Sequence, residues 1–136
     1  MDLGIKGKTA LVLASSRGLG QAMAVALARE GVNVAVTGRN PEGLAQSVAM
    51  IEAAGGKAIA LNWDLSDLSV IDAHISKVEA TFGPIDILIN NTGGPAPTPA
   101  AGQDPLLWAK SFNDMVLSLI AITVRVLPSM RQRGWG

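Results

Sequence analysis

Short apolar segments alternate with helix-forming segments four times along the chain, and this alternation is the feature that most limits its fold. The apolar segments are nearly continuous runs of hydrophobic residues, which is typical of strands that are buried on both faces. Three of the helical segments end at glycine, at Gly31, Gly55 and Gly83. The predicted strands are 9–14, 32–37, 58–61 and 85–90, and the predicted helices are 18–30, 41–54, 67–82 and 105–131.

Strands of this kind form a parallel sheet that helices cover on both faces, so the predicted class is α/β. Right-handed crossovers make the sheet doubly wound, with the strand order 3-2-1-4. A ligand crevice is then expected at the carboxyl ends of strands one and four, where the strand order reverses. At 136 residues the chain has the length of one ordinary domain, so a single portion of the Rossmann type is expected over 1–136.

The first predicted strand runs directly into a glycine-containing turn, Ser15-Ser16-Arg17-Gly18-Leu19-Gly20, after which a helix begins. In this context Gly18 can let the backbone approach a pyrophosphate, and Gly20 can let the helix pack on the strand. The helix N-terminus offers free N–H groups and a positive dipole end, and Ser15 and Ser16 add hydroxyl donors. The turn therefore predicts a phosphate-binding loop, with an ordinary strand-to-helix connection as the alternative.

These residues resemble the short-chain dehydrogenase/reductase family, whose fingerprint in this turn is Thr-Gly-x-x-x-Gly-x-Gly. The segment 13–20 matches the last two glycines but places Leu13 and Ala14 where the family has Thr and Gly. If the turn requires a positive φ at Ala14, the backbone is expected to be strained there. Asn90-Asn91-Thr92-Gly93, at the end of the fourth strand, is similar to the family's Asn-Asn-Ala-Gly. The two motifs flank the expected crevice, and together they are more specific than either alone.

The remaining part of the chain extends this resemblance. Asp64-Leu65 looks like the family's Asp-hydrophobic pair, in which the Asp accepts a hydrogen bond from the adenine amino group. Trp108 and the segments 127–130 and 131–136 look like the family's fourth helix, closest to members that resemble 3-oxoacyl-[acyl-carrier-protein] reductases. The resemblance implies an oxidoreductase that transfers hydride between a nicotinamide cofactor and a small carbonyl or alcohol substrate. It also implies a homo-oligomer whose subunits meet through helix 105–131.

The end of the second predicted strand indicates which cofactor is bound. An NAD site normally carries Asp or Glu there to accept from the ribose 2′-OH, whereas this chain has Gly38 followed by Arg39. Arg39 can pair with a 2′-phosphate through a bidentate fork, and in the family a basic residue in the place of Arg17 accompanies NADP. NADP is therefore expected rather than NAD, with two solvated surface arginines as the alternative. The expected cofactor-binding residues are Ser15, Ser16, Arg17, Gly18, Leu19, Gly20, Arg39, Asp64, Leu65, Asn91 and Gly93.

No catalytic residue is assigned within this sequence. The family's reductases use a Tyr-x-x-x-Lys pair and a Ser, and the chain contains no tyrosine. The family's Asn in the fourth helix falls on Met115, whose thioether is only a weak acceptor. The chain is therefore interpreted as a fragment of a longer enzyme or as a natural truncation, and alone it is expected to lack reductase activity. The competing function is a non-catalytic NADP-binding or subunit-interaction module.

Charge and cysteine content restrict the partners further. Eleven basic residues balance eleven acidic ones, so no net field attracts nucleic acid or an anionic membrane. The chain has no cysteine, and no metal site is expected. His74, the one histidine, is interpreted as part of a solvated helix face. The N-terminus has no signal-peptide pattern, and the apolar stretch 115–127 is shorter than the roughly 20 residues of a membrane span. A cytoplasmic protein without membrane partners is therefore expected.

Overall fold

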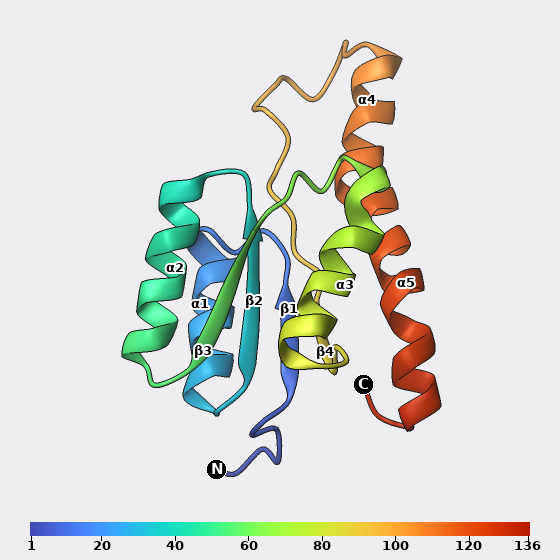
Figure 1. The fold of residues 1–136 in the computed structure, drawn as a ribbon. Coiled ribbons are helices and arrows are strands. Elements are labelled where there is room, and N and C mark those ends of the chain that lie inside the picture. Colours follow the sequence, from blue (N-terminus) through green and yellow to red (C-terminus); the bar gives the residue numbers. More distant parts are fainter.

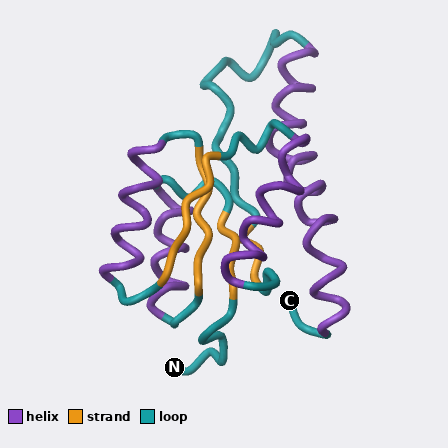
Figure 2. The backbone as a smooth tube through the Cα atoms, viewed as in Figure 1, coloured by secondary structure: helices purple, strands orange, loops and turns teal.

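A computed structural model describes the whole chain, Met1–Gly136. Its four strands run parallel in one sheet, in the order β3-β2-β1-β4, which confirms the predicted doubly wound topology. Figure 1 shows α1 and α2 on one side of this sheet and α3 and α5 on the other, and Figure 2 shows the same layers by element type. The strands are β1 (Thr9–Val12), β2 (Asn33–Gly38), β3 (Lys57–Asn62) and β4 (Ile87–Ile89).

Polar caps fix the starts of two helices at the predicted places. The Asn40 side chain accepts hydrogen bonds from the backbone N–H groups of Glu42 and Gly43, and Pro41 is the first residue of its helix. Asp104 accepts from the N–H of Leu106 in the same way. The helices are α1 (Gly18–Arg29), α2 (Pro41–Ala53), α3 (Ile71–Phe82), α4 (Pro105–Phe112) and α5 (Ser118–Arg133).

The core has two halves, one on each face of the sheet, and β1 contributes to both. Leu11 and Leu13 pack toward α3 and α5, whereas Ala10 and Val12 pack toward α1 and α2. All four side chains are fully buried, since successive residues of a strand point to opposite faces. This explains why the strand sequences show no polar alternation, and it places the carboxyl end of β1 at the centre of the molecule.

Several element boundaries differ from the expected ones, most of them by one or two residues. β1 ends at Val12 instead of residue 14, because the backbone turns at Ala14 with a positive φ, although the N–H of Leu13 still donates to Ile89 (3.2 Å). β4 is also shorter than predicted, at Ile87–Ile89. The predicted helix 67–82 begins with a short 3₁₀ turn, Leu68–Val70, before α3. The predicted last helix contains a π-helical turn, Asn113–Leu117, between α4 and α5.

His74 does not lie on a fully solvated helix face, so this interpretation was wrong. Its imidazole stacks on the indole of Trp63, with ring centroids 4.7 Å apart and planes at 21°. Trp63 is buried in the core half beneath α3, which the sequence pattern around His74 did not reveal. Desolvation lowers the pKa of His74 from its ordinary value of 6.5, Lys77 lowers it further, and Asp67 raises it.

Polar contacts attach α5 to the rest of the fold. Arg125 donates from Nε to Asp72 (2.7 Å) and from Nη1 to Glu79 (3.4 Å), both on α3. Arg133 pairs with the Asp86 carboxylate beside the start of β4. By length and composition the helical stretch Pro105–Arg133 could cross a membrane, a test that helices packed on protein also pass. The expectation that no membrane is involved stays a prediction.

Candidate functional site

A cavity of about 640 Å³ opens at the carboxyl ends of β1 and β4, which is the place where the sequence predicted a ligand crevice. The turn after β1 forms its floor, the ends of β2 and β3 form one wall, and the loop after β4 with α4 forms the other. The lining includes Ser16, Arg17, Gly18, Leu19, Gly20, Arg39, Asp64, Leu65, Asn91, Gly93, Lys110, Asp114 and Met115. Ten of these thirteen residues belong to the predicted set, so the structure brings almost all of that set together.

Close backbone packing shapes the floor of the crevice. A Cβ at Gly20 would lie 2.1 Å from the carbonyl oxygen of Ala14, so only glycine lets α1 approach β1 this closely. Ala14 has a φ of +47° and is the one residue other than glycine with a positive φ. The expected strain at this position is therefore confirmed. Asn91 supports the same turn, because its Nδ2 donates to the carbonyl oxygens of Leu13 (3.3 Å) and Ala14 (3.1 Å).

The N-terminus of α1 faces this floor without a side-chain cap. Arg17 occupies the cap position and makes no capping hydrogen bond, and the first turn carries no acidic residue. Helices α2 and α4, in contrast, have their first N–H groups satisfied by Asn40 and Asp104. Uncapped N–H groups at a helix start, together with the positive end of the dipole, form a binding place for an anion.

Ser15 is the one member of the predicted set that the structure does not place in the crevice. Its side chain is fully buried; the hydroxyl donates to the carbonyl of Val12 (2.7 Å) and accepts from the N–H of Thr37 (2.9 Å). The backbone N–H of Ser15 also donates to Thr37 (2.8 Å), so the residue still pairs with β2. Its predicted use as a phosphate donor was wrong, whereas Ser16 does line the cavity.

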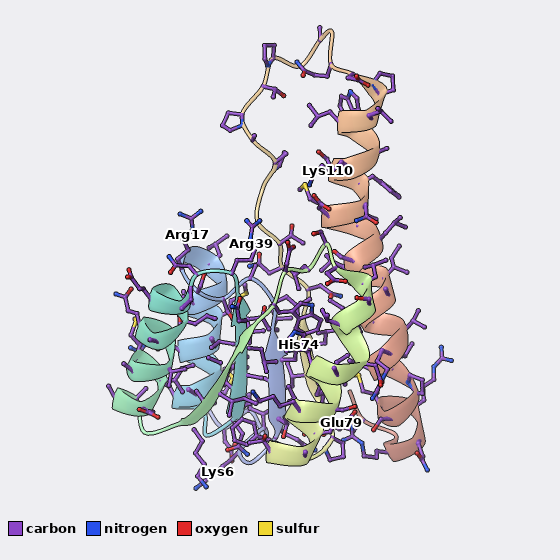
Figure 3. All side chains as sticks on the ribbon, turned by 45° about the horizontal axis from the view of Figure 1, so that its top comes forward. Lys6, Arg17, Arg39, His74, Glu79 and Lys110 are labelled. Carbon is purple, nitrogen blue, oxygen red and sulfur yellow. The ribbon has the colours of Figure 1, made fainter.

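Two arginines lie at the rim of the crevice. Arg17 and Arg39 are both exposed and both line the cavity, and Figure 3 shows them close to the carboxyl-terminal end of the sheet. Gly38, which ends β2, has no side chain, and a Cβ there would lie 2.9 Å from that of Ser16. The end of β2 thus offers a guanidinium and no carboxylate to a molecule in the crevice.

Asp64 and Leu65 follow β3 and face the same cavity. The Ser66 hydroxyl (2.7 Å) and backbone N–H (3.0 Å) both donate to Asp64 and lower its pKa below the ordinary value, and Arg39 and Lys110 lower it further. Leu65 is half-buried and packs against the core. Asp64 is therefore a fixed, ionised acceptor at the crevice edge.

The sequence interpretation missed the part of the wall that α4 and the π-helical turn after it supply. Lys110 and Asp114 form an i,i+4 ion pair that lines the cavity, and Ser111 lies on the same side. Met115 also lines the cavity, so the residue that replaces the family's Asn does face the crevice. A signal was available: residues three to four positions before Met115 share its helix face, which includes Ser111.

Trp63 is a further residue that sequence reasoning missed. It lines the cavity although its side chain is only 1% exposed, and its indole N–H is the one buried side-chain polar group without a hydrogen-bond partner. The sequence offered one signal for Trp63, which is its position directly before the predicted site residue Asp64. Neighbouring residues at the end of a strand border the same crevice.

Comparison with known proteins agrees with this geometry. The short chain dehydrogenase family profile matches residues 8–136. The ketoacyl reductase HetN of a Nostoc species is 39% identical over 132 residues, which are 97% of this chain and 46% of that protein.

Solved structures give the same picture. L-sorbose reductase from Gluconobacter frateurii, complexed with NADPH and L-sorbose, superimposes with a TM-score of 0.89 at 29% identity, over 98% of this chain and 51% of that one. An NAD⁺-bound xylitol dehydrogenase reaches the same TM-score at 26% identity, over 97% and 51%. This chain thus spans about half the length of the relatives it matches. The match of sequence and fold over nearly all of its residues shows that the chain belongs to the short chain dehydrogenase family.

Proposed function

We propose that this chain is the cofactor-binding part of an NADP(H)-dependent oxidoreductase, which transfers hydride between nicotinamide and a small carbonyl or alcohol substrate. One observation carries the choice of cofactor: Arg17 and Arg39 both line the crevice, and β2 ends at Gly38 without a carboxylate. A 2′-phosphate meets two cations there and no repelling charge. Family members bind either cofactor, as the NADPH and NAD⁺ complexes among the relatives illustrate.

The residues at the floor fit the phosphates of a dinucleotide. The uncapped N–H groups at the start of α1 can donate to a pyrophosphate, and Gly18 and Gly20 leave the backbone accessible. Ser16 adds a hydroxyl from the same turn. Leu19, which is 78% exposed, offers an apolar surface at the cavity edge.

The walls fit the two ends of the same ligand. Asp64, held by Ser66, can accept from an adenine amino group, and Leu65 can pack on the ring. Asn91 and Gly93 border the opposite side, where Asn91 keeps the turn after β1 in place. A bound nicotinamide supplies the hydride, and these residues bind and orient the cofactor. We further propose that residues 1–136 are the Rossmann portion of a single domain, in a cytoplasmic enzyme.

The NADP preference predicts the effect of Arg39→Ala. The variant is expected to bind NADPH about tenfold or more weakly, because a hydrogen-bonded pair with a charged group is lost. Its affinity for NADH should change little, because NADH lacks the 2′-phosphate. Calorimetric titration with both cofactors measures this, and Arg29→Ala, at the far end of α1, is the matched control. Equal wild-type affinities for NADPH and NADH, or an unchanged NADPH affinity in Arg39→Ala, would contradict the proposal.

A non-catalytic module that binds NADP or a second subunit is the other candidate. Two observations favour it: Met115 occupies the crevice wall where the family has an Asn, and a row of apolar side chains is exposed on α4 and α5. We propose a second copy of this chain as the partner that covers that row. Residues 1–136 alone are expected to be inactive under either function, because they contain no tyrosine. NADPH oxidation with a panel of aldehydes and ketones therefore separates the two functions when it is measured on a longer protein that contains these residues.

A further inference from the structure

A polar network ties α1 and α2 to the turn after β1, and the proposed dinucleotide site gives this network no role. The hydroxyl of Ser47, on α2, is fully buried and donates to the carbonyl oxygen of Ser15 (2.8 Å). The side-chain amide of Gln21, on α1, donates to the Ser47 hydroxyl (2.9 Å) and to the carbonyl oxygen of Ser16 (3.4 Å). Neither Gln21 nor Ser47 lines the crevice, so both act on the turn from behind it.

Gly43 lets α2 come close to the same turn. A Cβ at this position would lie 2.8 Å from the carbonyl oxygen of Ser16 and 3.1 Å from the Cβ of Ser16. Gly43 lies in the first turn of α2 and has no positive φ, so close approach, and not backbone conformation, explains the glycine here. Ser47 follows four residues later and lies on the same face of the helix. This face of α2 packs on the turn, and Figure 1 shows α1 and α2 side by side on one face of the sheet.

The network also orients two peptide units of the turn. In a trans peptide the carbonyl and the following N–H point in opposite directions, so the N–H groups of Ser16 and Arg17 point away from Ser47 and Gln21. Neither N–H donates to a group of the protein, and both residues line the crevice. The network therefore keeps the hydrogen-bond donors of this turn available to a bound molecule.

The packing of α2 also determines where Arg39 lies. Arg39 stands directly before Asn40, the residue that caps α2, so its backbone moves with the start of this helix. Arg17 stands in the turn, at the start of α1. Figure 3 shows both arginines at the carboxyl-terminal end of the sheet. The distance between the backbones of Arg17 and Arg39 thus depends on how closely α2 packs on the turn.

We propose that Gln21, Gly43 and Ser47 are positioning residues that hold Arg39 beside the turn and thereby favour NADPH over NADH. This inference rests on the proposed function, because it concerns the 2′-phosphate that Arg17 and Arg39 are proposed to bind. A phosphate that pairs with both arginines is sensitive to the distance between them, since charge-assisted hydrogen bonds need close contact and good alignment. A pyrophosphate at the start of α1 depends less on α2, because N–H groups of a single helix start hold it.

The test compares NADPH and NADH by calorimetric titration of the purified protein and its variants. Ser47→Ala and Gln21→Met each remove hydrogen bonds of the network, and each should weaken NADPH binding about threefold to tenfold. The affinity for NADH should stay nearly unchanged, because NADH has no 2′-phosphate. Ser76→Ala on α3 and Gln46→Met on α2, both at exposed positions, are the matched controls that should keep the wild-type affinities.

Gly43→Ala tests the close approach separately. Alanine favours a helix more than glycine does, so this substitution should not weaken α2 itself. The added Cβ must push α2 away from Ser16, because it would otherwise lie 2.8 Å from the carbonyl oxygen. The NADPH affinity of Gly43→Ala should therefore fall at least as far as that of Ser47→Ala, again with little change for NADH.

The outcomes separate this inference from the proposed function. Affinities for NADPH and NADH that fall by the same factor in the variants, or that change in none of them, would overturn the inference and leave the network as a contact that only stabilises the fold. A wild type that binds both cofactors equally, or neither, would contradict the proposed function and this inference with it. Circular dichroism of each variant beside its control shows whether it is folded. If Ser47→Ala unfolds, Gln21→Met decides the question, because Gln21 is only half-buried.

Discussion

Ala14 combines a strained backbone conformation with a position at the floor of the crevice. Its backbone is fixed from three directions: the N–H donates to the Thr37 hydroxyl (3.0 Å), Asn91 donates to its carbonyl, and Gly20 packs on the same carbonyl oxygen. These contacts hold a φ of +47° that an alanine avoids elsewhere. The family fingerprint, which has glycine here, made this strain predictable from the sequence.

Ala14→Gly is therefore expected to stabilise the protein. Glycine adopts a positive φ without steric cost, while its greater freedom in the unfolded chain offsets part of the gain, so we expect about 0.5–1 kcal/mol of net stabilisation. Urea unfolding followed by circular dichroism measures the free energy of unfolding. Ala26→Gly, at an exposed position inside α1, is the control and should destabilise by about 0.5–1 kcal/mol. Destabilisation by Ala14→Gly would show that the turn does not store this strain.

Other residues of the site show where sequence reasoning stops. Gly20 and Arg39 could be predicted, because a glycine motif and a strand end fix their positions along the chain. Ser15 could not, because its role depends on whether its backbone still pairs with β2, which is a tertiary fact. Lys110 and Asp114 could not either, since an i,i+4 pair on a helix surface is an ordinary solvated pair until the facing wall is known.

At the scale of elements, helix packing determines which polar residues are buried, and hydrophobic periodicity alone predicted the exposure of one of them wrongly. Helix 67–82 was correctly predicted as amphipathic, yet His74 packs on Trp63 at the end of β3. The π-helical turn Asn113–Leu117 was not foreseen, because no proline or glycine marks it in the sequence. Such turns often occur at functional sites, and this one contains Met115, which borders the crevice.

The stack between β3 and α3 predicts a pH dependence of stability. The folded state lowers the pKa of His74 through desolvation, so the folded protein binds fewer protons at this site than the unfolded chain. The contribution is fully present above the ordinary value of 6.5 and is lost as the pH falls through the lower pKa of the folded state. The melting temperature should therefore decrease as the pH is lowered from about 8 to about 5.

His74→Phe tests the origin of this fall, because phenylalanine keeps a ring on Trp63 but cannot be protonated. In this variant the decrease of the melting temperature over the same pH range should be smaller than in the wild type. Asp64 and Asp114 have lowered pKa values and remain ionised over this range, so they do not interfere. An identical decrease in both proteins would exclude His74 as its source.

At the scale of the whole molecule, the order of the strands was predictable and the outer surface was not. Apolar runs and right-handed crossovers were sufficient for the order β3-β2-β1-β4. Which apolar residues of α4 and α5 are exposed could not be predicted from the sequence, because one face of α5 packs in the core through Ile122 and Val126. Figure 1 shows α5 beside α3 on the same side of the sheet, at the edge of the molecule. Exposed apolar side chains of this stretch that do not line the crevice are Leu106, Trp108, Phe112, Val116, Leu117, Ile120 and Val124.

An apolar surface of this kind on a folded protein indicates an interface, which we have proposed to be with a second copy of the chain. The double substitution Ile120→Glu and Val124→Glu places charges at its exposed centre, where the two side chains are 52% and 65% exposed. Because neither side chain belongs to the core, the variant should fold as the wild type does while its subunits dissociate to monomers. Sedimentation velocity over a range of concentrations measures this, with Met50→Glu on α2, 41% exposed, as the control that should keep the wild-type assembly. A wild type that is monomeric at every concentration, or a double variant that assembles as the wild type does, would show that this surface does not join two copies.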